Sequence, residues 1–219
     1  PEGIFYYAME LLRGLTLRDL ISEHGAQCEA RAIHILIHVC ESLKEAHAAG
    51  LIHRDIKPGN IFLCERGGMP DTVKVLDFGL AKATDSGTSG SQDANNSPTL
   101  TARATQMGMI IGTAAYMSPE QAKGKMVDRR ADIWAFGVVL YEMLTGCRAF
   151  EGEDISTTLA AVLMKDPEWT ALPANTPPAL VTLVQRCLEH HAVVPDHAEH
   201  APLDGDRFDG GTRMWCRPD

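Results

Sequence analysis

Four polar residues between positions 55 and 77 have the types and spacing that phosphoryl transfer needs. Asp55 can accept a hydrogen bond from an incoming hydroxyl group, and Lys57 can place a positive charge on a transferring phosphoryl group. Asn60 and, seventeen residues later, Asp77 offer the hard oxygen ligands that suit Mg²⁺, and Gly79 lets the backbone turn sharply behind Asp77. A lone Asp-x-Lys is usually a surface ion pair and a lone Asp-Phe-Gly is usually a turn. Their combination in this order favours a catalytic site.

The composition is that of a globular protein whose main activity is not nucleic-acid binding. The 219 residues are 45% hydrophobic and 22% charged, with a net charge of −9. The six cysteines form no Cys-x-x-Cys pair, which favours thiols in a reducing compartment over disulfides or a zinc site. We find no signal peptide, and no apolar run approaches the roughly 18 residues of a membrane span. Because the chain starts Pro-Glu-Gly, without an initiator Met, we expect an internal fragment.

The elements that must position these residues are mostly helices. The apolar pattern predicts helices over 16–24, 30–49, 132–145, 156–164 and 178–189, and strands over 4–9, 61–63 and 73–76. Gly14 is expected to interrupt the chain between the first strand and the first helix. Residues 84–98 are small and polar and predict a loop, and the residues after about His190 show no periodicity.

Two helices have apolar faces that predict how they pack. On the helix over 30–49, we expect the buried face to contain Ile33, Ile37, Cys40 and residues 43–46. The helix over 132–145 is apolar nearly all round, Ile133 included, which predicts a position in the middle of the core.

Two further motifs follow the polar residues in the sequence. Residues 112–120 read Gly-Thr-Ala-Ala-Tyr-Met-Ser-Pro-Glu, and residues 132–137 read Asp-Ile-Trp-Ala-Phe-Gly. Together with His-Arg-Asp-Ile-Lys-Pro-Gly-Asn at 53–60 and Asp-Phe-Gly at 77–79, they make the chain resemble the eukaryotic-type protein kinase family. The resemblance covers about residues 4–189, is of the serine/threonine type, and is strongest to bacterial members. It implies an α+β, mainly α fold, namely the large lobe of a kinase with short β-hairpins around the catalytic loop.

The resemblance implies an ATP-dependent protein serine/threonine kinase that uses Mg²⁺. In such an enzyme Asp55 orients the substrate hydroxyl, and Lys57 stabilises the γ-phosphoryl group. Asn60 and Asp77 hold Mg²⁺, and Thr113 helps to fix the segment that binds the protein substrate.

The resemblance also assigns residues that contact the nucleotide. Met9 takes the gatekeeper position beside the adenine, and the backbone of Glu10 and Leu12 meets the adenine edge. Leu63 forms the floor beneath the ring.

Regulatory and structural residues follow from the same resemblance. Arg54 is expected to pair with a phosphorylated activation loop, in which Thr101 and Thr105 are the candidate phosphosites. Asp132 is expected to brace the catalytic loop, and Glu120 to be a buried structural residue.

The implied partners are a protein substrate that presents Ser or Thr, and a second kinase domain that pairs with this one for activation. Nucleic acid is not an expected partner. The implied location is the cytoplasm, and a membrane anchor in the intact protein would lie on a segment outside these residues.

The ends of the chain depart from the family pattern. No Gly-x-Gly-x-x-Gly precedes His53, and the single lysine before it, Lys44, lies in a predicted helix. We therefore expect the last small-lobe strand and hinge at 1–14, the large lobe at 15–190 with its activation segment at 77–120, and an irregular tail at 191–219.

The tail lacks the arginine that the family pairs with the glutamate at position 120. A frameshift or misjoined sequence near His190 is our hypothesis for this loss. If Glu120 were buried without that partner, the fold would lose about 3–5 kcal/mol.

Two other functions compete with a kinase. A non-catalytic scaffold derived from a kinase is favoured by the missing small lobe and disfavoured by the intact Asp55, Asn60 and Asp77. A small-molecule phosphotransferase with a similar Asp-Asn-Asp arrangement is disfavoured by Ser-Pro-Glu at 118–120 and by the long activation segment.

Overall fold

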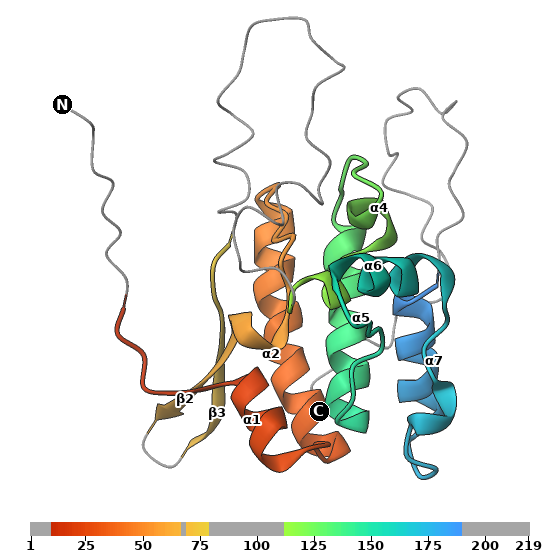
Figure 1. Ribbon diagram of the computed structural model, residues 1–219. Helices are drawn as coiled ribbons and strands as arrows, with labels where there is room; N and C mark the ends of the chain where they lie inside the picture. Colours follow the sequence, from red (N-terminus) through yellow and green to blue (C-terminus); the bar gives the residue numbers. More distant parts are fainter. Residues whose placement is uncertain (1–9, 67–68, 79–111, 190–219) are drawn as a thin grey trace, which may run out of the picture. The chain divides into compact units, whose positions relative to one another are not determined.

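The computed structural model describes residues 10–66, 69–78 and 112–189, which form a mainly helical assembly with one small sheet (Figure 1). In chain order the elements are β1 (Gly14–Thr16), α1 (Leu17–His24), α2 (Glu29–Ala48), η1 (Pro58–Asn60), β2 (Ile61–Arg66), β3 (Met69–Val75), η3 (Ala114–Tyr116), α4 (Pro119–Ala122), α5 (Arg130–Thr145), α6 (Ile155–Met164), η4 (Trp169–Ala171) and α7 (Pro178–Cys187), where η marks a short 3-10 helix. The predicted strand at 4–9, the loop at 84–98 and the tail at 191–219 lie outside the described residues.

The sheet is antiparallel, with the strand order β1-β2-β3. Gly14, expected to interrupt the chain, instead begins β1 and pairs with Cys64. A Cβ atom at this position would lie 1.9 Å from the carbonyl oxygen of Leu63, so β1 can approach β2 this closely only because residue 14 is glycine. The predicted strands at 61–63 and 73–76 are confirmed as parts of β2 and β3, although β3 ends one residue earlier than predicted, at Val75.

Helix α2 occupies the predicted range within one residue at each end, and its expected buried face is confirmed at Leu43 and Ala46 but wrong at Ile33 and Ile37. Ile33 and Ile37 are 40% and 52% exposed, whereas Ile35, Leu36 and Val39 are buried. The buried positions keep the i, i+3, i+4, i+7 spacing of one helix face, which continues to Leu43 and Ala46. A run of apolar residues on more than one side of a helix does not identify the side that packs.

Helix α5 is central, as its apolar composition predicts. Thirteen of its sixteen residues are buried, and it packs against both α2 and α7. A Cβ atom on Gly137 would lie 2.5 Å from the Cβ atom of Cys187, so this glycine permits the close approach of α7. Ile133, which we expected in the core, is 44% exposed.

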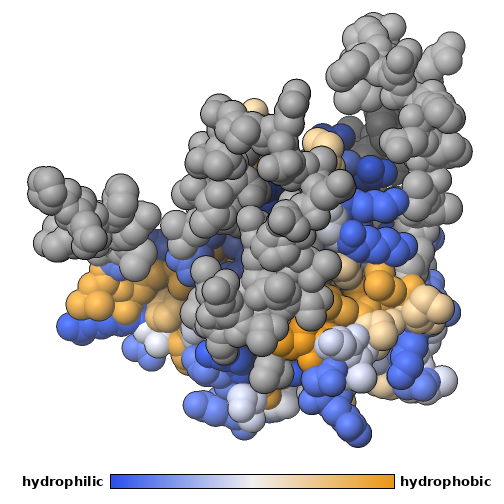
Figure 2. Space-filling model, turned by 45° about the horizontal axis from the view of Figure 1, so that its top comes forward, coloured by the Kyte–Doolittle hydropathy of each residue, from blue (hydrophilic) through white to orange (hydrophobic). Residues whose placement is uncertain are grey.

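Helices α6 and α7 confirm the last two predicted helices, although α7 ends two residues before the expected end. In the described residues, no helix is long and apolar enough to cross a membrane. Several large hydrophobic side chains are exposed, among them Leu11, Met126 and Met164. The face seen in Figure 2 accordingly carries hydrophobic surface between hydrophilic residues.

Candidate active site

The β2–β3 hairpin brings together the two stretches of sequence that carry the predicted metal ligands. Ile61, the first residue of β2, pairs with Val75, the last residue of β3. One residue beyond this pair, the Leu76 N–H donates to the carbonyl oxygen of Asn60 over 2.8 Å. Asn60 and Asp77 therefore flank the same end of the hairpin, although seventeen residues separate them in the sequence.

Asp55 is the centre of a hydrogen-bonded cluster. Its Oδ2 accepts from Lys57 Nζ over 2.7 Å and from Asn60 Nδ2 over 3.0 Å, and Asn60 Nδ2 also donates to the Asp55 backbone carbonyl over 2.8 Å. Lys57 Nζ in addition donates to Thr113 Oγ1 over 3.0 Å. Four predicted site residues are thus linked by a continuous series of hydrogen bonds, from Asn60 through Asp55 and Lys57 to Thr113. The other carboxylate oxygen, Asp55 Oδ1, has no hydrogen-bond partner among the described residues.

Asp132, in the first turn of α5, holds the backbone of the loop that carries Asp55. Its Oδ1 accepts from the Arg54 N–H over 2.8 Å and its Oδ2 from the His53 N–H over 2.9 Å. Arg54 has a φ of +68°, in the left-handed region that non-glycine residues rarely adopt. The buried carboxylate thus fixes a backbone conformation that is unfavourable by itself.

His47 is a member of this arrangement that the sequence analysis missed. Its Nε2 lies 2.8 Å from Asp132 Oδ2, so the last turn of α2 supplies a third donor to this buried carboxylate. The sequence feature that could have pointed to His47 is its position in the last turn of a predicted helix, six residues before His53.

His53 joins the loop to the segment after β3. The Asp55 N–H donates to His53 Nδ1 over 3.2 Å, so Nδ1 accepts, and Nε2 carries the proton and donates to the Leu76 carbonyl over 2.8 Å. The imidazole is buried, with Phe78 at its edge 4.7 Å away between ring centroids. Both ring nitrogens are engaged in hydrogen bonds, so His53 packs within the loop and is not placed to act as a base. Asp77, between Leu76 and Phe78, is exposed and has a φ of +62°.

The predicted nucleotide-contacting residues are only partly described. Met9 lies outside the described residues. Glu10 is exposed and forms an ion pair with Lys74 of β3, and Leu12 is half-buried. Leu63 is buried within the sheet, where it pairs with residues of both neighbouring strands.

The predicted phosphosites Thr101 and Thr105 also lie outside the described residues. Their expected partner, Arg54, has a buried Nε without a hydrogen-bond partner in the part of the chain that the structure describes. The backbone carbonyl of Arg54 accepts from Gln121 Nε2 over 2.8 Å, which ties α4 to the loop.

Glu120 differs from our expectation of a buried residue. Its side chain is half-buried at the surface of α4. The pKa of Arg130 is raised by the hydrogen bond and charge of Asp128, with a smaller contribution from Glu120. The penalty considered above for a buried, unpaired carboxylate therefore does not apply.

A second buried carboxylate, that of Glu142, contacts the segment 113–118, and the sequence analysis missed it too. Tyr116 Oη donates to Glu142 Oε2 over 2.6 Å, and both residues are buried. Burial raises the pKa of Glu142, while the hydrogen bond from Tyr116 and the charge of Arg148 lower it by less. The sequence feature that could have pointed to Glu142 is that it is the single acidic residue inside the apolar run of α5.

The chain matches known proteins over most of its length. The family model of the protein kinase domain matches residues 2–192. The probable serine/threonine-protein kinase PknB of Corynebacterium glutamicum is 43% identical over 162 residues, which are 74% of this chain and 22% of that protein. The serine/threonine-protein kinase PknB of Mycobacterium tuberculosis is 40% identical over 168 residues, which are 76% of this chain and 24% of that protein.

A third relative covers more of the chain. The serine/threonine-protein kinase pkn3 of Myxococcus xanthus is 39% identical over 190 residues, which are 85% of this chain and 33% of that protein. The matched part thus spans about a fifth to a third of the length of these curated relatives. Because the family model matches residues 2–192, most of the chain, the chain belongs to the protein kinase family, and within it to the bacterial-like, eukaryotic-type serine/threonine kinases.

Proposed function

We propose that the chain is the large, mainly helical lobe of a protein kinase that transfers the γ-phosphoryl group of Mg·ATP to a Ser or Thr hydroxyl of a protein. The observation that best supports this is the contact among Asp55, Lys57, Asn60 and Thr113. It gathers a carboxylate, a cation and an amide within hydrogen-bond distance at the end of the hairpin that leads to Asp77, as phosphoryl transfer requires.

The catalytic roles follow from which atoms are already engaged. Asp55 Oδ1 accepts the hydrogen bond of the substrate hydroxyl, because Oδ2 is held by Lys57 and Asn60. Lys57, between Asp55 and Thr113, places its ammonium beside the transferring group and ties the substrate-binding segment to the loop.

The donor set fits Mg²⁺. The amide nitrogen of Asn60 faces Asp55, which leaves its oxygen as a ligand atom, and the exposed carboxylate of Asp77 lies at the same hairpin end. In the described residues no cluster of three or more His, Cys, Asp or Glu could hold a metal, so these two oxygens suit an ion that keeps waters and phosphates as its other ligands. Bound there, Mg²⁺ would neutralise phosphate charge.

We assign the nucleotide contacts by the family resemblance. Met9 is the gatekeeper, the backbone of Glu10 and Leu12 meets the adenine edge, and Leu63 lies beneath the ring. In this assignment residues 1–14 supply the last small-lobe strand and the hinge.

Regulation is assigned to Arg54 and the activation segment at 77–120. A phosphate on Thr101 or Thr105 would pair with the Arg54 guanidinium, whose Nε has no partner among the described residues. Pairing of two kinase domains would allow one to phosphorylate the other, and the catalytic domain would act in the cytoplasm on protein substrates.

Phosphate transfer from Mg·ATP to a basic substrate protein tests the function. The kinase in this assay should be as long as its curated relatives, so that it includes the small lobe. Asp55→Asn should lower the rate by about 10²–10⁴-fold, the range for loss of a positioned proton acceptor. Asp166→Asn, a change at an exposed aspartate outside the cluster, is the control and should leave the rate unchanged. Equal rates for Asp55→Asn and the wild type, or no transfer by either, would favour the scaffold function instead.

A further inference from the structure

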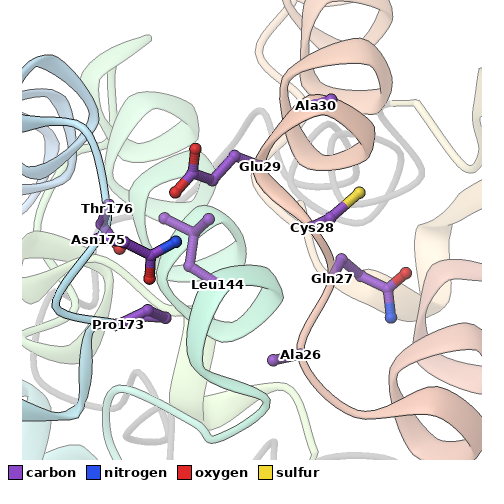
Figure 3. A pocket seen from close by; sticks show the side chains of 9 residues that line it. All are labelled: Ala26, Gln27, Cys28, Glu29, Ala30, Leu144, Pro173, Asn175 and Thr176. Atoms are coloured by element: carbon purple, nitrogen blue, oxygen red, sulfur yellow. The ribbon is translucent and has the colours of Figure 1, made fainter.

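Two histidines of α2 lie one helical turn apart, outside the candidate active site. His34 and His38 are four residues apart, which puts both side chains on one face of the helix, and their ring centroids are 4.7 Å apart. Neither belongs to the cluster around Asp55, and neither lines the cavity of about 510 Å³ at the start of the same helix (Figure 3). The proposed phosphoryl transfer therefore gives this pair no role.

The other histidines of the described ranges differ from this pair. His47 contacts Asp132, and both ring nitrogens of His53 are engaged within the loop. His24 is exposed, in the last turn of α1. Among these residues, only the two rings on α2 lie against each other and are outside the active site.

A backbone hydrogen bond holds the ring of His38 in the tautomer that suits a metal ligand. Its Nδ1 lies 3.0 Å from the carbonyl oxygen of His34. Because a carbonyl oxygen can only accept, Nδ1 carries the proton and donates, and Nε2 keeps the lone pair that a metal ion needs. Histidines that bind metals usually donate their other N–H to a carbonyl or carboxylate in this way. One ligand atom is thus prepared before any ion binds.

His34 can supply the second ligand atom. An imidazole has two nitrogens, so His34 can keep a hydrogen bond at one of them and bind an ion through the other. Both histidines are half-buried, so solvent reaches them. Since α2 packs against both β3 and α5, the two ligands are carried by an element that is held in place.

The charges beside the pair favour a cation. Glu41 and Glu45 are exposed and follow His38 by three and seven residues, which places them on the same side of the helix. The cation on this side, Arg31, already has an interaction partner. In the described part of the chain, no group of three or more His, Cys, Asp or Glu could hold a metal, so water molecules would complete the coordination of an ion bound by two histidines.

We propose that His34 and His38 together bind one divalent ion of a late transition metal, such as Zn²⁺, through one nitrogen each. Imidazole nitrogen suits Zn²⁺, whereas Mg²⁺ prefers oxygen ligands. Two histidines four residues apart on a helix can share one zinc ion, because the helix already brings their rings together. The ion stabilises the folded state, since the unfolded chain does not hold the two rings in place. The site does not depend on the proposed phosphoryl transfer.

Urea unfolding of the 219-residue chain with and without millimolar Zn²⁺ tests the pair. Zn²⁺ should raise the ratio of folded to unfolded protein about tenfold more for the wild type than for His34→Gln or His38→Gln, as a dissociation constant of about 0.1 mM requires. Thiols of the unfolded chain also bind Zn²⁺, but they do so equally in all three proteins, so the difference reports the pair.

Two controls accompany the unfolding measurement. His24→Gln makes the same change at an exposed histidine of α1, and this variant should respond to Zn²⁺ as the wild type does. Mg²⁺ should produce no difference between the wild type and the two α2 variants, which separates this site from the proposed magnesium ligands. An equal response of all four proteins to Zn²⁺ overturns the proposal.

A second measurement needs no substitution. Diethylpyrocarbonate modifies imidazole nitrogens, and mass spectrometry gives the extent of modification at each histidine. Millimolar Zn²⁺ should lower the modification of His34 and His38 about tenfold and leave that of His24 unchanged, whereas Mg²⁺ should protect none of them. Equal protection of all three histidines by Zn²⁺, or no protection of the pair, overturns the proposal.

Discussion

Two acidic residues are buried in α5, and the structure holds them in different ways. Asp132, in the first turn, accepts from two backbone N–H groups and from His47. Glu142, ten residues later, accepts from one phenolic hydroxyl, that of Tyr116, and burial raises the pKa of its carboxyl above the ordinary value. One helix therefore supports both sides of the candidate active site, through carboxylates with unequal sets of donors.

The difference lies in what each carboxylate can control. The donors to Asp132 are mainly backbone groups, so this residue fixes the path of the main chain, including the left-handed Arg54. In the described residues, the hydrogen bond from Glu142 to the segment 113–118 is made to a side-chain hydroxyl, that of Tyr116, and to no backbone group. We infer that the Asp132 contact is the rigid one, and that the Glu142 contact can respond to protonation and to substitution of its single donor.

Replacing Asp132 should therefore have the largest effect. Asp132→Ala leaves the N–H groups of His53 and Arg54 buried without acceptors, which should lower the free energy of unfolding by about 2–6 kcal/mol. Urea unfolding followed by tryptophan fluorescence measures this. Asp166→Ala, at an exposed site, is the control. A loss below that of Tyr116→Phe would contradict the greater rigidity of the Asp132 contact.

Removing the single donor to Glu142 should have the next largest effect. Tyr116→Phe leaves a buried carboxylate without its phenol partner and should cost about 1–3 kcal/mol of unfolding free energy. Tyr141→Phe is a matched control, because Tyr141 Oη donates over 2.8 Å to a neutral acceptor, the Glu168 backbone carbonyl. This change should cost only about 0.5–1.5 kcal/mol. Equal losses would mean that the charge of Glu142 is not what makes its hydrogen bond important.

The contrast between the two carboxylates also marks what the sequence could predict. Asp132 belongs to a motif with a recognisable order, so its role as a brace could be predicted without coordinates. Glu142 and His47 belong to no such motif, and their contacts depend on which turns of α2 and α5 face the loop. Sequence spacing alone does not fix such long-range pairings.

Helix ranges were predicted more reliably than helix faces, and the reason is physical. The length of α2 follows from its local apolar pattern and from Gly50, which follows the helix in the sequence, so both ends were close. Its apolar residues occur on more than one side, and neighbouring helices decide which side packs, so Ile33 and Ile37 were assigned wrongly. The backbone at Gly14 shows the same limit, since only the approach of β2 explains that glycine.

The third donor to Asp132 should contribute less than either backbone donor. His47→Leu removes this donor but leaves both N–H groups in place, so the expected loss of unfolding free energy is about 1 kcal/mol. His47→Gln keeps an N–H donor at a similar position and should recover most of the loss. If both variants lost the same amount, the contribution of His47 would come from packing and not from the hydrogen bond.

The smallest effect is a dependence of the unfolding free energy on pH that arises from Glu142. The pKa of Glu142 is raised in the folded state, chiefly by burial, so the fold binds this proton more tightly than the unfolded chain does. The wild type should therefore gain stability relative to Glu142→Gln as the pH falls through the folded pKa, and the gain should be complete below the ordinary value of 4.5. Urea unfolding of both proteins at a series of pH values measures the difference, with Glu153→Gln, at an exposed glutamate, as the control. A difference that stays constant with pH, or that grows in favour of the Gln variant as the pH falls, would mean that Glu142 is held as firmly in its charged form as a carboxylate with several donors.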